Sequence, residues 1–161
     1  QEPEARRAME ILKHNGTPCL IHQPRYNMLD RWVEDGLLDA LEEAGAGCIA
    51  YSPLAQGALT DRYLKGIPQG SRASRGATSI QERYLSSEKL EMIQKLNQIA
   101  LGRGQSLAQM ALLWILRKPQ ITSVLVGASS SAQLKDSIAS LQGPEFTSEE
   151  LETIDRILKK E

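Results

Sequence analysis

The amino-acid sequence predicts a parallel α/β fold, and three observations support that prediction. Short apolar runs alternate with segments of helical spacing, which is the pattern of parallel strands joined by crossover helices. The strand candidates are apolar throughout, as strands covered on both faces are. Only three of them are found in 161 residues, where about five would fit at ~30 residues per strand–helix–strand unit. Three parallel strands leave two open edges, so the sheet is expected to be part of a larger one.

The first half of the chain predicts a helix, a strand, a helix and a strand. Residues 3–16 have helical spacing, with Pro3 at the start and Gly16 just past the end, an asymmetry typical of helices. The elements that follow are a strand over 19–21, a helix over 37–45 that closes on Gly45, and a strand over 47–51.

The second half predicts two helices, a strand and two more helices after a long loop. The first helix covers 86–104 and has Leu90, Ile93, Asn97 and Ala100 at helical spacing. The second covers 106–119 and has a wide apolar face, made of Leu107, Met110, Ala111, Trp114 and Ile115. The strand over 122–129 is rich in β-branched residues and is bounded by Gly127; a helix over 130–143 and a final helix that starts at Thr147 follow it.

Start signals accompany three of these helices. Ser106 with Gln109, Ser130 with Gln133, and Thr147 with Glu150 have the spacing of a capping box, in which two side chains satisfy the first backbone N–H groups of a helix. Phe146 and Leu151 would make a hydrophobic staple around the last of them.

The loop after the second strand is long and carries glycine and positive charge. Glycines stand at 57, 66 and 70, prolines at 53 and 68, and basic side chains at 62, 65 and 72. Long loops inside compact domains are uncommon and tend to be functional or disordered. This loop is therefore predicted to hold the phosphates of a nucleotide cofactor.

Three strand ends could form the site, because parallel α/β folds hold ligands at the carboxyl ends of their strands. They are residues 22–27, 52–57 and 127–130, all of them polar and all with Gly or Pro. Two precede helices whose free N–H groups favour anions. Together they predict a ligand that bears phosphate.

Plainer interpretations remain open at each position. Gln133 could serve only as a cap with Ser130, Arg72 could be a solvated loop arginine, and Ser52-Pro53 could merely terminate a strand. His22 and Tyr26 have no nucleophile beside them in the sequence, so no catalytic role is assigned to either.

Composition excludes several classes of function. With 19 Lys and Arg against 20 Asp and Glu, no net charge directs the surface to nucleic acid or to an anionic membrane. No apolar run approaches the ~20 residues of a membrane span, and no His or Cys spacing suits a metal. Cys19 and Cys48 are predicted to be small packing residues rather than a disulfide, which favours a reducing, cytoplasmic compartment.

Three stretches, 18–41, 47–74 and 103–138, resemble the aldo-keto reductase family in order and separation. They read "PCLIHQPRYNMLDRWVEDGLLDAL", "GCIAYSPLAQGALTDRYLKGIPQGSRAS" and "RGQSLAQMALLWILRKPQITSVLVGASSSAQLKDSI". The resemblance covers nearly the whole chain and is nearest to the branch of bacterial L-glyceraldehyde 3-phosphate reductases and potassium-channel β subunits. It implies the C-terminal portion of a (β/α)8 TIM barrel, strands six to eight and their helices, so that residues 1–161 are an incomplete domain.

The resemblance also implies an NADP(H) cofactor and the residues that would hold it. Gln23 would hydrogen-bond the nicotinamide carboxamide, and Tyr51 would stack on its ring. The pyrophosphate would be lined by Ser52, Pro53, Leu54, Gln56 and Gly57. The basic residues at the phosphates and the adenosine would be Arg62 and Arg72, and the residues around the adenine ribose and its 2′-phosphate would be Gly127, Ser129, Gln133 and Asp136.

The implied activity is NADPH-dependent reduction of small aldehydes or ketones, such as glyceraldehyde 3-phosphate or a methylglyoxal-like compound. The family's catalytic Asp, Tyr, Lys and His have no match here, so no catalytic residue is assigned and the isolated chain is expected to be inactive. A homo-oligomer remains possible. The alternatives are a non-catalytic nucleotide-binding subunit of the potassium-channel β type and an independent α/β domain with another acidic ligand.

Overall fold

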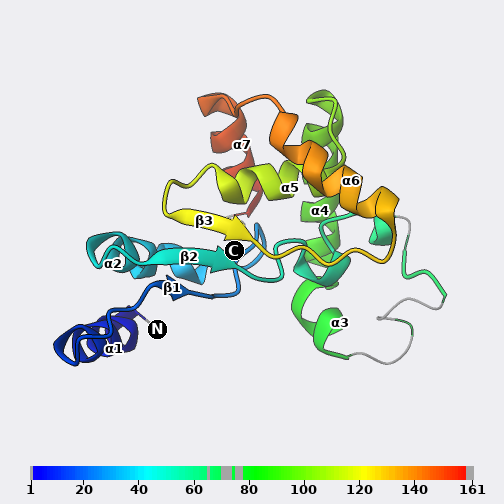
Figure 1. Ribbon diagram of the computed structural model, residues 1–161. Coiled ribbons are helices and arrows are strands. Elements are labelled where there is room, and N and C mark those ends of the chain that lie inside the picture. Colours follow the sequence, from blue (N-terminus) through cyan, green and yellow to red (C-terminus); the bar gives the residue numbers. More distant parts are fainter. Residues whose placement is uncertain (1, 65, 70–73, 75–77, 159–161) are drawn as a thin grey trace. The chain divides into compact units, whose positions relative to one another are not determined.

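The computed structural model describes residues 2–64, 66–69, 74 and 78–158 (Figure 1). They fall into two compact units between which the chain passes three times. One unit is built from 1–53 and 115–126, and the other from 54–114 and 127–161. Arg72, one of the predicted phosphate ligands, lies outside the described residues.

The first unit holds a three-stranded parallel sheet in the order β1-β2-β3 (Figure 1), as the alternation of elements predicted. Its strands are β1 (Ile21–His22), β2 (Gly47–Ala50) and β3 (Ile121–Val124). β2 is central: Ile21 pairs with Gly47, and Cys48 pairs with Ile121, with a register irregularity after Cys48. Among the described residues, β1 and β3 each pair on one side only, so both edges of the sheet are open.

All three predicted strands differ in their bounds, the second only at Tyr51, which follows β2 and forms an isolated bridge with Arg25. The first begins at Ile21 rather than at Cys19, because its partner β2 begins only at Gly47, whose N–H donates to the Leu20 carbonyl (2.9 Å). The third ends at Val124, although the Leu125 N–H still donates to the Ala50 carbonyl (2.9 Å). Parallel pairing thus sets the strand ends, and apolar character alone overestimates them.

Helices α1 (Glu2–His14) and α2 (Leu37–Glu43), with the 3-10 turn η1 (Trp32–Glu34), complete the first unit. α2 packs on β2 and η1 with buried Leu37, Leu38, Ala40 and Leu41. It ends before Gly45, the residue on which the helix was predicted to close, and Gly45 takes a left-handed φ of +66°. α1 lies against α2, and Arg6 pairs with Glu2 on its own helix and with Glu43 on α2.

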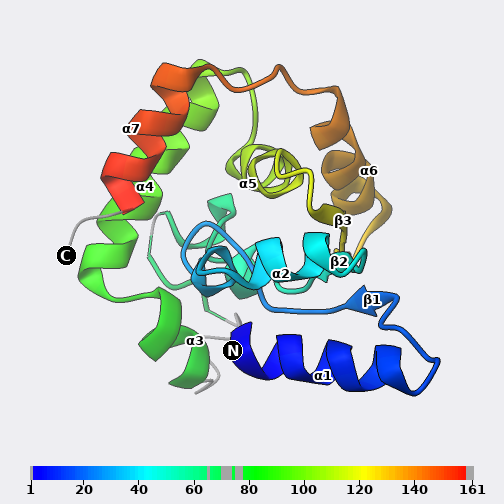
Figure 2. The ribbon, with the colours of Figure 1, turned by 90° about the vertical axis from the view of Figure 1, so that its left-hand side faces the viewer.

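The second unit is mainly helical. It contains α3 (Thr78–Tyr84), α4 (Ser87–Gly102), most of α5 (Leu107–Leu116), α6 (Ser131–Ala139) and α7 (Ser148–Leu158), with the 3-10 turns η2 (Ala55–Gly57), η3 (Asp61–Tyr63) and η5 (Ser140–Gln142). α7 runs along α4 (Figures 1 and 2). The described core of this pair includes Ile93, Leu96 and Ile154, all fully buried.

α3 corrects the prediction of a loop without helices between β2 and α4. Ile80 and Tyr84 are fully buried and lie four residues apart, on one face of the helix. Two apolar residues are too few to show a helical period in the sequence. Their burial nevertheless stabilises the helix, because each belongs to a successive turn of α3. Among the described residues, the α-helices α3, α4 and α5 therefore separate β2 from β3, where two helices were predicted.

The predicted caps can be checked atom by atom. At α5, Ser106 Oγ accepts the Gln109 N–H and Gln109 Oε1 accepts the Ser106 N–H, both at 3.1 Å. At α7, Thr147 and Glu150 make the same reciprocal pair at 3.2 and 2.7 Å. Both capping boxes are confirmed.

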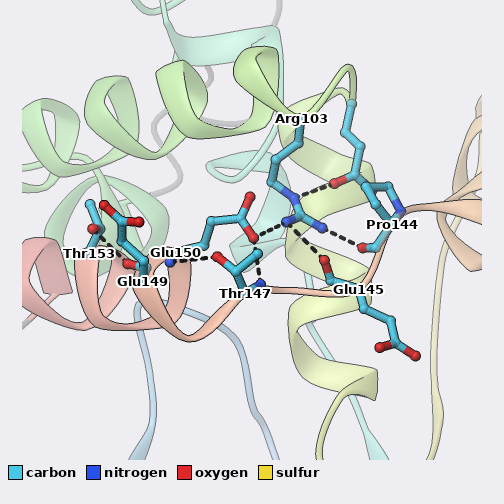
Figure 3. A network of polar contacts seen from close by, with 8 residues as sticks. Arg103, Pro144, Glu145, Thr147, Glu149, Glu150 and Thr153 are labelled. Atoms are coloured by element: carbon cyan, nitrogen blue, oxygen red, sulfur yellow. Dashed lines mark hydrogen bonds and ion pairs between the residues drawn. The ribbon is translucent and has the colours of Figure 1, made fainter.

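Arg103, after α4, joins the start of α7 to this unit (Figure 3). Its side chain is 4% exposed and donates to Glu150 Oε2 (2.6 Å), the Pro144 carbonyl (2.5 Å) and Gln105 Oε1 (2.8 Å). Its guanidinium also stacks 3.9 Å from the centre of the Phe146 ring. One arginine thus holds the whole turn that leads into α7.

Candidate functional site

The predicted site residues divide between the two units. Those of the first unit are Gln23, Tyr51, Ser52 and Pro53, and the described ones of the second are Leu54, Gln56, Gly57, Arg62, Gly127, Ser129, Gln133 and Asp136.

In the first unit, the ends of β1 and β2 stay paired beyond the regular strands. Arg25 and Tyr51 form a parallel bridge: the Tyr51 N–H donates to the Pro24 carbonyl (2.9 Å) and the Tyr26 N–H to the Tyr51 carbonyl (3.3 Å). Gln23 and Tyr51 therefore stand at the carboxyl ends of neighbouring strands. Both side chains are exposed, Tyr51 to 39%, and so are available to a ligand.

Ser52 takes a left-handed φ of +52°, which is uncommon for a residue with a side chain. Fully buried Asn27 holds it there, because Asn27 Nδ2 donates to the Ser52 carbonyl (3.1 Å). Asn27 is itself fixed by a backbone pair with Asp30 and by the Leu29 N–H, which donates to Asn27 Oδ1 (3.0 Å). Asn27 is thus a positioning residue that sequence reasoning noted only as a polar strand end.

The left-handed backbone continues into the second unit at Ala55 (φ +49°), Gln56 (φ +57°) and Gly57 (φ +100°). The turn is closed by the Gly57 N–H, which donates to the Leu54 carbonyl (2.8 Å), and by the Leu59 N–H, which donates to the same carbonyl (3.2 Å). All positive-φ residues other than glycine in the described chain lie within 52–56. Strain of this kind gathers at ligand-binding segments, and turns that expose successive N–H groups bind anions.

Arg62 follows this turn on η3. Thr60 caps η3 by accepting the Arg62 N–H (3.2 Å), and its hydroxyl donates to the Gly57 carbonyl (2.7 Å). The backbone of Arg62 is therefore tied to the Gly57 turn through one threonine, while its side chain is exposed. A fixed backbone and an exposed guanidinium would allow Arg62 to bind a phosphate group of a ligand.

The start of α6 is the last predicted stretch. Ser130 Oγ accepts the Gln133 N–H (3.3 Å), as a cap does. The Gln133 side chain does not return to the Ser130 N–H, as the predicted capping box requires; its Oε1 accepts the N–H and the hydroxyl of Ser129, both at 2.9 Å. Gln133 thus orders Ser129, and its amide NH2 group is the part that remains for a ligand. Gly127, Ser129 and Gln133 are all exposed.

Asp136 differs from these neighbours because it faces α5. Its Oδ1 accepts from Gln109 Nε2 (2.7 Å) and its Oδ2 from Ser106 Oγ (3.3 Å). The carboxylate is half-buried. Both carboxylate oxygens of Asp136 therefore accept hydrogen bonds from within the protein.

The two side chains left without a catalytic role show no arrangement that activates a nucleophile. Burial lowers the pKa of His22. Tyr26 is fully buried, and burial together with its hydrogen bond to Glu34 (2.6 Å) raises the pKa of its hydroxyl. Both cysteines are free thiols; Cys48 is buried, which raises its pKa to about 11, whereas Cys19 is only half-buried.

Two features are absent from the part of the chain that the structure describes. The described residues contain no cluster of three or more His, Cys, Asp or Glu that could hold a metal ion. None of their helices has the length and apolarity needed to cross a bilayer.

Comparison with known proteins gives a consistent result. The profile described as "Aldo/keto reductase family" matches residues 2–159. Over 159 residues, 96% of this chain, the sequence is 46% identical to L-glyceraldehyde 3-phosphate reductase of Escherichia coli K12, and 47% identical to that of E. coli O157:H7. It is 34% identical over 151 residues to a candidate voltage-gated potassium channel subunit beta of Schizosaccharomyces pombe. The matched parts are 46%, 46% and 44% of those proteins, so the chain spans about half the length of these relatives.

Proposed function

Because the chain belongs to the aldo/keto reductase family, we propose that it carries the NADP(H)-binding part of a reductase for small aldehydes or ketones. The observation that carries the proposal is the run 52–57, where Ser52, Ala55 and Gln56 hold left-handed backbone angles. The run follows directly on β2, at the strand end where parallel α/β folds bind ligands.

The chemistry of the residues fits a dinucleotide. The exposed Gln23 amide and Tyr51 ring would orient the nicotinamide, and the left-handed run would meet the pyrophosphate with Ser52 and backbone N–H groups. Arg62, Ser129 and Gln133 would meet the remaining phosphate and ribose oxygens. A third phosphate group needs a cation, so we expect NADPH to bind more tightly than NADH. When bound, NADPH supplies the hydride that reduces a carbonyl carbon.

We further propose that the chain corresponds to strands six to eight of the family's barrel and their helices. The open edges of the sheet support this: Leu20 before β1 is 79% exposed, and Leu125 and Val126 after β3 are 46% and 36% exposed. The half-length match to the relatives supports it as well. We also propose that the chain lacks the family's catalytic Asp, Tyr, Lys and His, so that it would bind the cofactor alone without turnover.

The similarity to a protein named L-glyceraldehyde 3-phosphate reductase supports a small phosphorylated aldehyde as the substrate of the whole protein. A second candidate function is a non-catalytic nucleotide-binding subunit, which the match to a potassium channel subunit beta favours. Turnover by a complete barrel that contains this chain would select the first. A cytoplasmic location and a homo-oligomer stay predictions.

The test is a titration of the purified chain with NADPH and NADH, followed by quenching of tryptophan fluorescence. We expect saturable binding of NADPH, weakened about tenfold by Gly57→Ala, which corresponds to about 1.4 kcal/mol. Gly45→Ala is the matched control, because it also adds a side chain at a left-handed glycine (φ +66°) but at the end of α2, where the added Cβ meets nothing within 4 Å.

Two results would contradict the proposal. One is the absence of NADPH binding by a chain that circular dichroism shows to be folded. The other is NADPH-dependent reduction of glyceraldehyde 3-phosphate by the 161-residue chain itself, because that would place the catalytic groups within it.

A further inference from the structure

Helix α6 has no buried residue that could anchor it to its unit. Leu134, Ile138 and Leu141, spaced along one face of α6 and η5, are 45%, 58% and 61% exposed. An amphipathic helix normally turns its apolar stripe toward the core. Here the half-buried Asp136 makes side-chain hydrogen bonds to the start of α5.

Asp136 extends the α5 capping box to a third member. Ser106 and Gln109 satisfy each other's backbone N–H groups with their oxygen atoms, and they donate with what remains, the Ser106 hydroxyl and the Gln109 amide, to the two oxygens of Asp136 (3.3 and 2.7 Å). The residues that start α5 thus also fix the middle of α6.

A second anchor lies just past the end of α6. At Gly143 an added Cβ would stand 2.3 Å from Gln105 Nε2 and 3.0 Å from Leu113 Cδ2, so the backbone there packs closely against the side chains of Gln105, before α5, and Leu113, on α5. With both anchors in place, the start of α6, with Gln133 in its first turn and Ser129 just before its N-cap, has a defined direction from α5.

We propose that Asp136 is a positioning residue that locks α6 to the α5 cap and so sets where Ser129 and Gln133 meet the cofactor, rather than a direct cofactor ligand. The inference rests on the proposed function. A carboxylate beside a phosphate would be repelled, whereas the same carboxylate satisfied by two neutral donors of α5 can hold the helix in place.

The test uses a swap that reverses the direction of the hydrogen bond. Gln109→Glu keeps the α5 capping box, since Glu is an ordinary partner of Ser in that motif, but it sets a second carboxylate against Asp136. We expect it to weaken NADPH binding about tenfold, because the two like charges repel each other across that contact. Adding Asp136→Asn supplies an amide donor to that carboxylate and should restore binding to within about twofold of the unchanged chain.

Controls and a second readout separate this role from a merely structural one. Gln98→Ala, at an exposed glutamine on α4, should leave the affinity unchanged. Hydrogen exchange of the α6 amides should rise in Gln109→Glu and return in the double variant, while the melting temperature changes by only a few degrees.

Unchanged NADPH affinity in Gln109→Glu, or a double variant as weak as Gln109→Glu alone, would overturn the proposal. If the unchanged chain does not bind NADPH at all, the proposed function fails. The exchange data still decide the inference in that case: a loss of α6 protection that the swap restores supports the lock, and constant protection overturns it.

Discussion

Helices α6 and α7 follow one another in the chain and belong to the same unit, yet they are held in opposite ways. α7 buries Ile154 completely against its unit, and its first turn is gripped by Arg103 (Figure 3). α6 buries no residue and exposes Leu134 and Ile138, while Asp136 ties it to α5.

The difference is one of coverage by the described residues. α7 has both a buried apolar side chain and a satisfied cap. α6 has an apolar stripe that the described residues leave exposed. If the chain is part of a barrel, as proposed above, we expect neighbouring units of that barrel to cover the stripe.

The largest expected effect comes from breaking the grip on α7. Arg103→Ala removes a nearly buried guanidinium and leaves the Glu150 carboxylate and the Pro144 carbonyl without their donor, so we expect about 4 kcal/mol loss in the free energy of unfolding. Urea denaturation measures it. Arg156→Ala, at an exposed arginine of α7, should cost less than about 0.5 kcal/mol. Equal costs for the two arginines would show that the network does not hold α7.

A matched pair of isoleucines tests the comparison of the two helices directly. Ile154→Ala on α7 should cost about 3 kcal/mol, because it empties a buried site. Ile138→Ala on α6 should cost less than about 0.5 kcal/mol, because the side chain is already 58% exposed. Urea denaturation of both variants of this chain gives the difference. In a complete barrel we expect the Ile138→Ala cost to grow, and a cost that stays small there would remove the argument that α6 is covered.

The close contact at Gly143, which joins the segment after α6 to α5, can be broken by adding a side chain there. Gly143→Ala forces a Cβ against Gln105 and Leu113, and overpacking of this kind costs about 2 kcal/mol. Gly102→Ala is the control: its Cβ meets nothing within 4 Å, so the variant should be neutral or slightly more stable. Thermal unfolding followed by circular dichroism compares them. A Gly143→Ala variant as stable as Gly102→Ala would mean that this contact relaxes freely.

The features that sequence reasoning predicted well depend on near neighbours. The capping boxes at Ser106 and Thr147 need a partner three residues on, and the α2 terminus needs only Gly45. The parallel sheet follows from the alternation of whole elements. The cap and terminus signals are contained in a window shorter than one element, and the alternation needs only the order of neighbouring elements along the chain.

The features that it missed depend on partners far along the chain. Asn27 holds Ser52 across 25 residues, and Asp136 meets Gln109 across 27, so no local pattern reveals either contact. The start of β1 depends on where β2 begins. α3 was missed for another reason, since Ile80 and Tyr84 alone mark its buried face. The assignment of Asp136 to the cofactor remains a prediction that competes with its role in holding α6.

The smallest effect concerns the pH dependence of the α7 cap. Partial burial opposes ionisation of Glu150, but hydrogen bonds from Thr147 and the pair with Arg103 outweigh it and hold the pKa of Glu150 below its usual 4.5. A lowered pKa in the folded state means that this contribution is complete above about pH 4.5 and is lost as the pH falls through the folded value. The stability difference between the unchanged chain and Glu150→Gln should therefore be constant from pH 7 to 5 and shrink below that, as urea midpoints would show. Glu149→Gln, one residue earlier in the same turn, is the control for loss of charge at the helix start. If both variants show the same pH dependence, the effect belongs to the helix terminus in general and not to the grip of Arg103 on Glu150.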